Sequence, residues 1–223
     1  MCYNKNVSII TFCVMIVTSI ILLIRNKQDD RWFGVFFIFA GLMQLAEYFM
    51  WIDQKGGKIN HYATLAAFII LLLQPLSLLI GGYYFGELSF DKKKLVPIII
   101  VYIICFGLGI FYGIKYSLKI KLFSKPDGKH LSWAIKKLWI SNLLRYVLYI
   151  LYYLAFLLLL FSKDKFSGIL LFILYFGTLF FSVFFVKNSS WKSFWCWIVN
   201  MIPVIYLIVS SIRNKKSKDT YYE

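Results

Sequence analysis

The sequence predicts an all-α protein, a polytopic bundle of seven transmembrane helices that forms a single domain over residues 1–223. Hydrophobic residues make up 61% of the chain and the mean hydropathy is +0.72, whereas soluble domains are about 45–50% apolar. Apolar runs of about 18 or more residues recur along the whole length, which is the signature of membrane-spanning helices. Composition and pattern therefore indicate the same fold class.

The apolar runs give the positions of the expected spans. They cover residues 7–24, 32–52, 62–85, 95–114, 138–162, 166–187 and 190–212. Each is long enough to cross about 30 Å of hydrocarbon at about 1.5 Å per residue. The first run has no small-residue cleavage pattern, so we interpret it as a retained helix rather than a signal peptide. An arrangement with six spans, in which one run lies in the membrane interface, is the alternative.

Residues 115–137, between spans four and five, alternate in polarity instead of forming another apolar run. Apolar and polar residues alternate over 116–123 and again over 130–135, on either side of the Pro126-Asp127-Gly128 turn sequence. Two alternating arms around such a turn predict a β-hairpin whose apolar face covers the helix ends. An irregular amphipathic loop is the alternative interpretation of this segment.

The net charge of +15 comes almost entirely from Lys and Arg in the short connections between apolar runs. Basic loops are typical of membrane topology, so we expect the lipid bilayer and anionic lipid headgroups as partners, and no nucleic acid. The two sides carry equal numbers of basic residues when the hairpin segment is counted. If that segment is a folded element, its basic residues do not count in the positive-inside rule. The N-terminus then lies outside or in a lumen, and the C-terminus lies in the cytoplasm.

The cysteines and histidines show no pattern of a metal or redox site. No two of Cys2, Cys13, Cys105 and Cys196 have such a spacing, and the chain has only two histidines. No nucleophile and base form a recognisable constellation either. We therefore expect no metal, no cofactor and no enzymatic activity.

One stretch of the second span carries polar groups inside an apolar run. Gln44, Glu47 and Trp51 have the spacing i, i+3, i+7, which places them on one face of a helix. An ionisable residue inside a span is costly, so it usually faces protein and has a partner. Glu47 therefore marks a candidate buried polar site.

Arg145 is the expected partner of Glu47. Both residues lie at similar depth below the side that carries the second and fourth loops, and leaving either alone in lipid costs at least about 2.5–3.5 kcal/mol. Asn142, one turn before Arg145, shares its helix face and belongs to the same predicted site. The sequence thus predicts an ion pair between spans two and five.

Two prolines mark a second candidate site near the bilayer midplane. Pro75 follows Gln74 midway along span three, and Pro203 lies three residues after Asn200 midway along span seven. Each proline removes a helix hydrogen bond, and broken helices at this depth are where transporters place substrate sites. The alternative is structural, because a nearby amide also serves to repair a broken backbone.

Aromatic residues and one histidine near the span ends are expected to lie in the membrane interface. Those predicted as interface anchors are Trp51, His61, Trp133 and Trp195.

Short pieces spread over most of the chain resemble an uncharacterised multi-pass membrane protein family encoded mainly by large DNA viruses of protists. The matching pieces are Met43-Gln44 through Glu47 to Trp51, Asn60 with Thr64, Gln74-Pro75, His130-Leu131-Ser132-Trp133, and Ser190 with Trp195-Cys196-Trp197. The resemblance implies no activity, because that family has none assigned.

Three functions fit these observations. The Glu-Arg site and the two proline-broken spans favour a small-solute or ion transporter or channel. The lack of any polar interval long enough for a soluble domain, together with the basic loops, favours a structural or assembly protein of a viral or host-derived membrane. A receptor-like or lipid-handling seven-helix protein is the third candidate.

Overall fold

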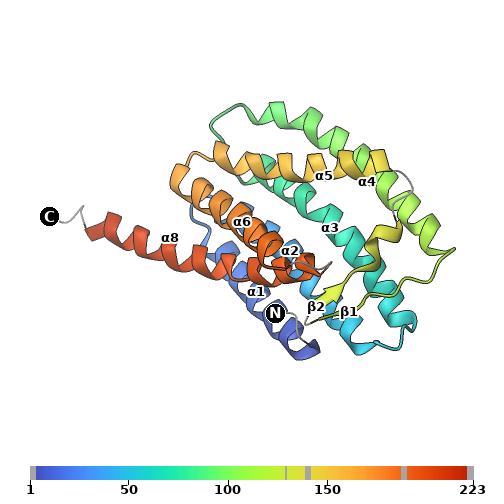
Figure 1. Ribbon diagram of the computed structural model, residues 1–223. Helices are drawn as coiled ribbons and strands as arrows, with labels where there is room; N and C mark the ends of the chain where they lie inside the picture. Colours follow the sequence, from blue (N-terminus) through green and yellow to red (C-terminus); the bar gives the residue numbers. More distant parts are fainter. Residues whose placement is uncertain (1–3, 129, 139–141, 187–189, 220–223) are drawn as a thin grey trace.

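The computed structural model of the protein describes residues 4–128, 130–138, 142–186 and 190–219, except for the side chains of 136, 137, 142 and 214–219. Eight helices are α1 Lys5–Arg25, α2 Asp30–Ile52, α3 Lys58–Tyr84, α4 Leu95–Ser117, α5 Asn142–Leu157, α6 Lys165–Phe185, α7 Trp191–Val199 and α8 Ile202–Asp219. Three short 3-10 helices are η1 Lys92–Lys94, η2 Ala134–Leu138 and η3 Leu158–Phe161. The described part of the chain is therefore all-α apart from one small sheet, as predicted (Figure 1).

Seven helical segments of the described chain are long and apolar enough to cross a membrane, with α7 and α8 together forming the last. Their number and places agree with the runs seen in the sequence. Some boundaries differ by a few residues. α3 begins at Lys58 rather than at residue 62, and span five was expected from residue 138, but α5 begins at Asn142. Leu138 instead ends η2 and is buried with Leu122 and Leu131 against the hairpin. Local hydropathy counted this residue with the span because it cannot distinguish burial in protein from burial in lipid.

The predicted hairpin is present but short. β1 Lys125–Asp127 pairs antiparallel with β2 His130–Ser132, in the register Pro126 opposite Leu131. Gly128 has a positive φ of 64°, which glycine adopts at little cost and which suits the turn between the two strands. The expected first arm over 116–123 is not a strand. α4 continues through Ser117, and the backbone N–H groups of Lys119 and Ile120 then bond to the Tyr116 carbonyl.

The alternating direction of the helices separates the connections into two ends of the bundle. We call the end that carries residues 53–57 and 118–138 the hairpin end. We call the other, which carries residues 26–29, 85–94 and 162–164, the C-terminal end. Figure 1 shows the two chain termini toward opposite ends. α2 and α3 are the most buried of these candidate spans: α2 packs against α1 and α3, α5 packs mainly against α3 and α4, and α7 packs mainly against α6.

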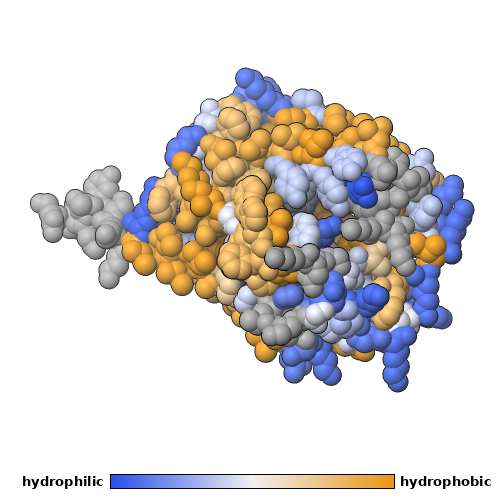
Figure 2. Space-filling model, in the orientation of Figure 1, coloured by the Kyte–Doolittle hydropathy of each residue, from blue (hydrophilic) through white to orange (hydrophobic). Residues whose placement is uncertain are grey.

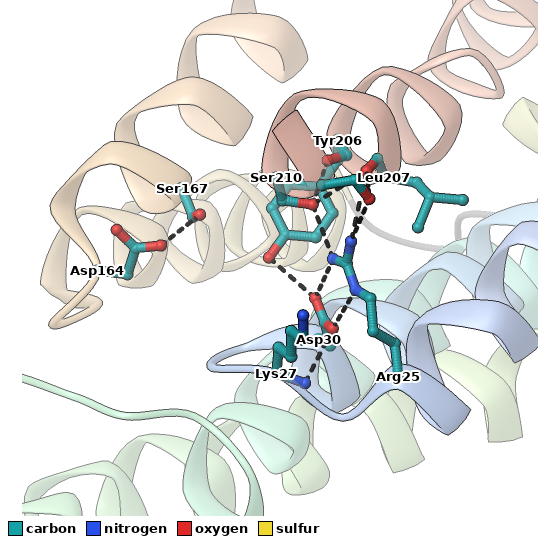
Figure 3. Close-up of polar contacts among 9 residues, drawn as sticks. Arg25, Lys27, Asp30, Asp164, Ser167, Tyr206, Leu207 and Ser210 are labelled. Atoms are coloured by element: carbon teal, nitrogen blue, oxygen red, sulfur yellow. Dashed lines mark hydrogen bonds and ion pairs between the residues drawn. The ribbon is translucent and has the colours of Figure 1, made fainter. Parts of the chain in front are cut away.

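A buried polar network closes the C-terminal end (Figure 3). Arg25 donates two hydrogen bonds of 2.7 Å to the Asp30 carboxylate, and its Nη2 also donates to the Ser210 hydroxyl at 2.7 Å. The Tyr206 hydroxyl donates to Asp30 Oδ1 at 3.3 Å. The Asp30 side chain is only 1% exposed, so the pair joins α1, α2 and α8 in an environment where a lone charge is costly.

Asp29, the residue before Asp30, links the three connections of the C-terminal end. Its carboxylate accepts hydrogen bonds from the backbone N–H of Glu87 and from the hydroxyl of Ser162. Burial raises the pKa of Asp29 above its ordinary value, against the opposing effect of those two hydrogen bonds. Asp164 differs: although burial alone would raise its pKa, hydrogen bonds from Ser167 and Arg213 hold that pKa below its ordinary value.

The two ion pairs of this end differ in exposure. We therefore expect that breaking each pair lowers the free energy of unfolding by a different amount. Asp30→Asn strands the Arg25 charge, whose side chain is only 15% exposed, and is expected to lower the free energy of unfolding by about 3 kcal/mol. Arg213→Gln removes a partner that is 45% exposed and is expected to cost under about 1 kcal/mol. Unfolding in mixed detergent micelles measures both. Equal losses for the two variants would contradict the assignment of Asp30 as a buried structural charge.

Candidate functional site

Glu47 lies inside the bundle, as its position in an apolar run predicted. Its side chain is fully buried, at 0% exposed, and its carboxylate accepts hydrogen bonds from Trp133 Nε1 at 3.0 Å and from Gln44 Nε2 at 3.3 Å. Thr11 of α1 donates to Gln44 Oε1 at 3.0 Å. The polar face of α2 thus connects α1 with the segment that follows β2.

Trp51, the third residue of that face, takes no part in this network. It is half-buried, and within the described part of the chain its indole N–H has no hydrogen-bond partner.

The predicted pair of Glu47 with Arg145 is not formed. Among the described residues, the ion pairs join Arg25 with Asp30 and Arg213 with Asp164. The Arg145 guanidinium instead lies over the Tyr146 ring, 5.0 Å from its centroid, and Nη2 donates to the Tyr146 hydroxyl at 3.4 Å. Residue counting gave the two residues similar depth but not their lateral positions, and α5 packs mainly against α3 and α4. Asn142 begins α5, and its side chain lies outside the described residues.

Asn60 of α3 holds the hairpin segment in place. Its side-chain oxygen accepts from the backbone N–H of Ser124 at 2.9 Å, and its Nδ2 donates to the Ser124 carbonyl at 2.9 Å. His61 Nδ1 accepts from the backbone N–H of Leu122 at 3.0 Å, so this predicted interface anchor supports the hairpin instead. Side chains of α3 therefore satisfy backbone groups that a longer strand would have satisfied.

Asp53 fixes the start of α3, from which Asn60 and His61 project. Its carboxylate accepts from the backbone N–H groups of Gly57 at 2.9 Å and Asn60 at 3.1 Å. These two hydrogen bonds lower the pKa of Asp53 below its ordinary value.

An aromatic cavity of about 160 Å³ lies between α3, α5, α7 and Trp133. We define it by its lining residues, which are Leu71, Leu72, Trp133, Leu148, Tyr149, Tyr152, Tyr153, Trp191, Lys192, Trp195 and Cys196. Its volume is close to that of engineered apolar cavities of about 150 Å³ that bind benzene. Figure 2 shows pale, weakly polar side chains gathered between α5 and α7, amid the orange of the surrounding helices.

Three walls of the aromatic cavity are fixed at their polar tips by hydrogen bonds to other residues. Trp133 donates to Glu47, the Tyr152 hydroxyl donates to Gln74 Oε1 at 2.9 Å, and Trp195 Nε1 donates to Thr178 at 3.3 Å. Trp133 and Trp195, predicted as interface anchors, therefore point their indole N–H groups into the bundle. Their polar atoms are already used, which leaves ring carbon as the main surface of the cavity.

The two predicted polar sites both adjoin the aromatic cavity, through Trp133 on one side and Tyr152 on the other. The cavity itself did not follow from the sequence, because its rings come from three separate segments. A partial signal exists in α5 and α7: Tyr149, Tyr152 and Tyr153 share one helix face, as do Trp191 and Trp195.

The proline prediction is correct for one span and wrong for the other. α3 continues through Pro75 without a break, and the Tyr102 hydroxyl donates to the nearby Leu72 carbonyl at 3.0 Å. A proline inside such a helix is tolerated when neighbouring side chains satisfy the backbone. The last span is interrupted at Asn200, between α7 and α8, and Pro203 lies in the first turn of α8. Asn200 is buried, and its Nδ2 has no partner in the described part of the chain.

Comparison with protein-family models, with curated proteins and with solved structures gives no match. Among the residues that the structure describes, no group of three or more His, Cys, Asp or Glu is placed to hold a metal ion.

Double-mutant cycles test which partner Glu47 has. Glu47→Gln and Trp133→Phe are expected to couple by about 1–2 kcal/mol in the free energy of unfolding, because each removes the same charge-assisted hydrogen bond. Glu47→Gln and Arg145→Gln are expected to be additive within about 0.5 kcal/mol. Strong coupling between Glu47 and Arg145 would show that the two residues form an ion pair after all. If Glu47 and Trp133 do not couple, their hydrogen bond does not stabilise the docked hairpin.

Proposed function

We propose that this protein spans a membrane seven times and binds the apolar part of a membrane-dissolved amphiphile in its aromatic cavity. The observation that carries the proposal is the cavity wall: six aromatic residues, three of them with their polar tips hydrogen-bonded elsewhere. Such a wall offers dispersion and ring-stacking contacts but few hydrogen bonds, which suits a ring or a short hydrocarbon segment. This belongs to the lipid-handling or receptor-like class expected from the sequence.

The place of the aromatic cavity supports entry from the side of the bundle. Tyr153, one of its walls, is 36% exposed on α5, beside the exposed apolar residues Ile150 and Leu154. In a bilayer these side chains would face hydrocarbon. A molecule dissolved in that hydrocarbon would reach the cavity without crossing water.

Transport of a polar solute is the second candidate, and the interruption of the last span at Asn200 favours it, because unwound helices line many solute sites. Against it, Glu47 is fully buried and hydrogen-bonded rather than placed as a titrating gate. A liposome assay of ions, protons and amino acids separates the two candidates. Flux that is abolished by Asn200→Leu would favour transport over ligand binding.

A heavy-atom quencher of ring size tests the aromatic cavity directly. Iodobenzene is expected to quench tryptophan fluorescence of the detergent-solubilised protein saturably and in competition with benzene, because Trp133, Trp191 and Trp195 line the cavity. Tyr149→Ala is expected to weaken this binding about fivefold through the loss of one ring wall.

The matched control for that experiment is Tyr146→Ala, which removes an exposed tyrosine of the same helix outside the cavity lining. It is expected to leave the affinity unchanged. Quenching that rises linearly without saturation, or equal effects of the two substitutions, would overturn the proposed function.

We also propose that the C-terminal end faces the cytoplasm. The basic residues around the hairpin belong to a folded element, so we do not count them in the positive-inside rule. The basic connections would then contact anionic headgroups. Single cysteines at Lys125 and Lys163, in a background without the native cysteines, are expected to react with an impermeant maleimide from opposite sides of the membrane. Labelling of both from one side would contradict an odd number of spans between them.

A further inference from the structure

Arg145 carries a positive charge that no ion pair among the described residues balances. It is half-buried near the start of α5, and its contacts are the ring and hydroxyl of the neighbouring Tyr146. A guanidinium at such a position in a span is costly unless it meets an anion, and guanidinium groups are well suited to carboxylates and phosphates.

The position of Arg145 relates it to the aromatic cavity. It lies one turn before Tyr149, so the two side chains share a helix face, and Tyr149 lines the cavity. Lys192, the second residue of α7, also lines the cavity, with its Nζ 5.8 Å from the Tyr149 ring centroid and 5.5 Å from that of Trp191. Both helices begin at the hairpin end, so two positive charges lie toward that end of an otherwise apolar cavity.

We infer that the amphiphile carries an anionic headgroup, a carboxylate or a phosphate, which lies between Arg145 and Lys192 while its apolar part occupies the aromatic cavity. This inference rests on the proposed function and names the chemistry of its ligand. The rings of Tyr149 and Trp191 place the ammonium of Lys192 against apolar surface, where its attraction for an anion is less screened than in water. A cationic amphiphile would be repelled from the same position.

The test compares ligands that share one ring and differ in charge. The probes are iodophenylbutyrate, its methyl ester and iodophenylbutyl phosphate, each followed by tryptophan quenching in a neutral detergent. The butyrate is expected to bind about tenfold more tightly than the ester, because only the carboxylate gains charge-assisted hydrogen bonds. Between the two anions, tighter binding of the phosphate would indicate a phospholipid headgroup, and tighter binding of the butyrate a free fatty acid.

Substitutions assign the difference to Arg145. Arg145→Gln is expected to reduce the preference for the anion to the part that Lys192 supplies while leaving ester binding unchanged, and Arg145→Lys is expected to keep most of it. Lys119→Gln makes the same change of charge at an exposed position of the hairpin end, outside the cavity lining, and is expected to have no effect. Thermal unfolding of each variant shows that it is folded.

The outcomes separate this inference from the proposed function. Equal affinities of wild type for butyrate, phosphate and ester would overturn the anionic headgroup and leave the aromatic cavity as a binding site for neutral amphiphiles. Saturable binding of none of the probes, including iodobenzene, would overturn the proposed function itself. If Arg145→Gln does not fold, the comparison of acid and ester in the wild type decides the matter alone.

Discussion

The hydrogen bond from Trp133 to Glu47 is the interaction on which the site depends. It satisfies a fully buried carboxylate, and an uncompensated charge in that place would cost several kcal/mol. The same bond attaches the segment after β2 to α2 and fixes one wall of the aromatic cavity. The paired bonds between Asn60 and Ser124 hold the segment before β1 to α3. The hairpin is thus held on both arms, and the cavity is complete only when it is docked.

The C-terminal end is closed by different chemistry. There the buried pair of Arg25 and Asp30 joins three helices, and Asp29 joins three connections through backbone and hydroxyl donors. The polar groups that hold the bundle together therefore gather near its two ends, while its middle is mostly apolar. An apolar cavity between α5 and α7 is compatible with such a bundle.

Glu47 and Arg145 show how far sequence reasoning about the site reached. The inward face of Gln44 and Glu47 followed from helical period, and the structure confirms it. The partner of Glu47 did not follow, because depth along a helix is a local count whereas lateral neighbours depend on how the helices pack. The pair of Arg25 with Asp30 was missed for a related reason: both residues flank a short connection, where charges are usually exposed, and only α8 brings Tyr206 and Ser210 over them.

The sequence by itself determined the number and places of the span-length helices, since hydropathy over about 20 residues is a local property. It also determined the turn of the hairpin, because Pro126-Asp127-Gly128 specifies chain reversal locally. Only the tertiary structure decided that Trp133 bonds Glu47, that α3 stays continuous at Pro75, and that rings from three segments enclose one cavity. These features join residues far apart in the chain, and a single sequence carries no local signal for which distant side chains become neighbours.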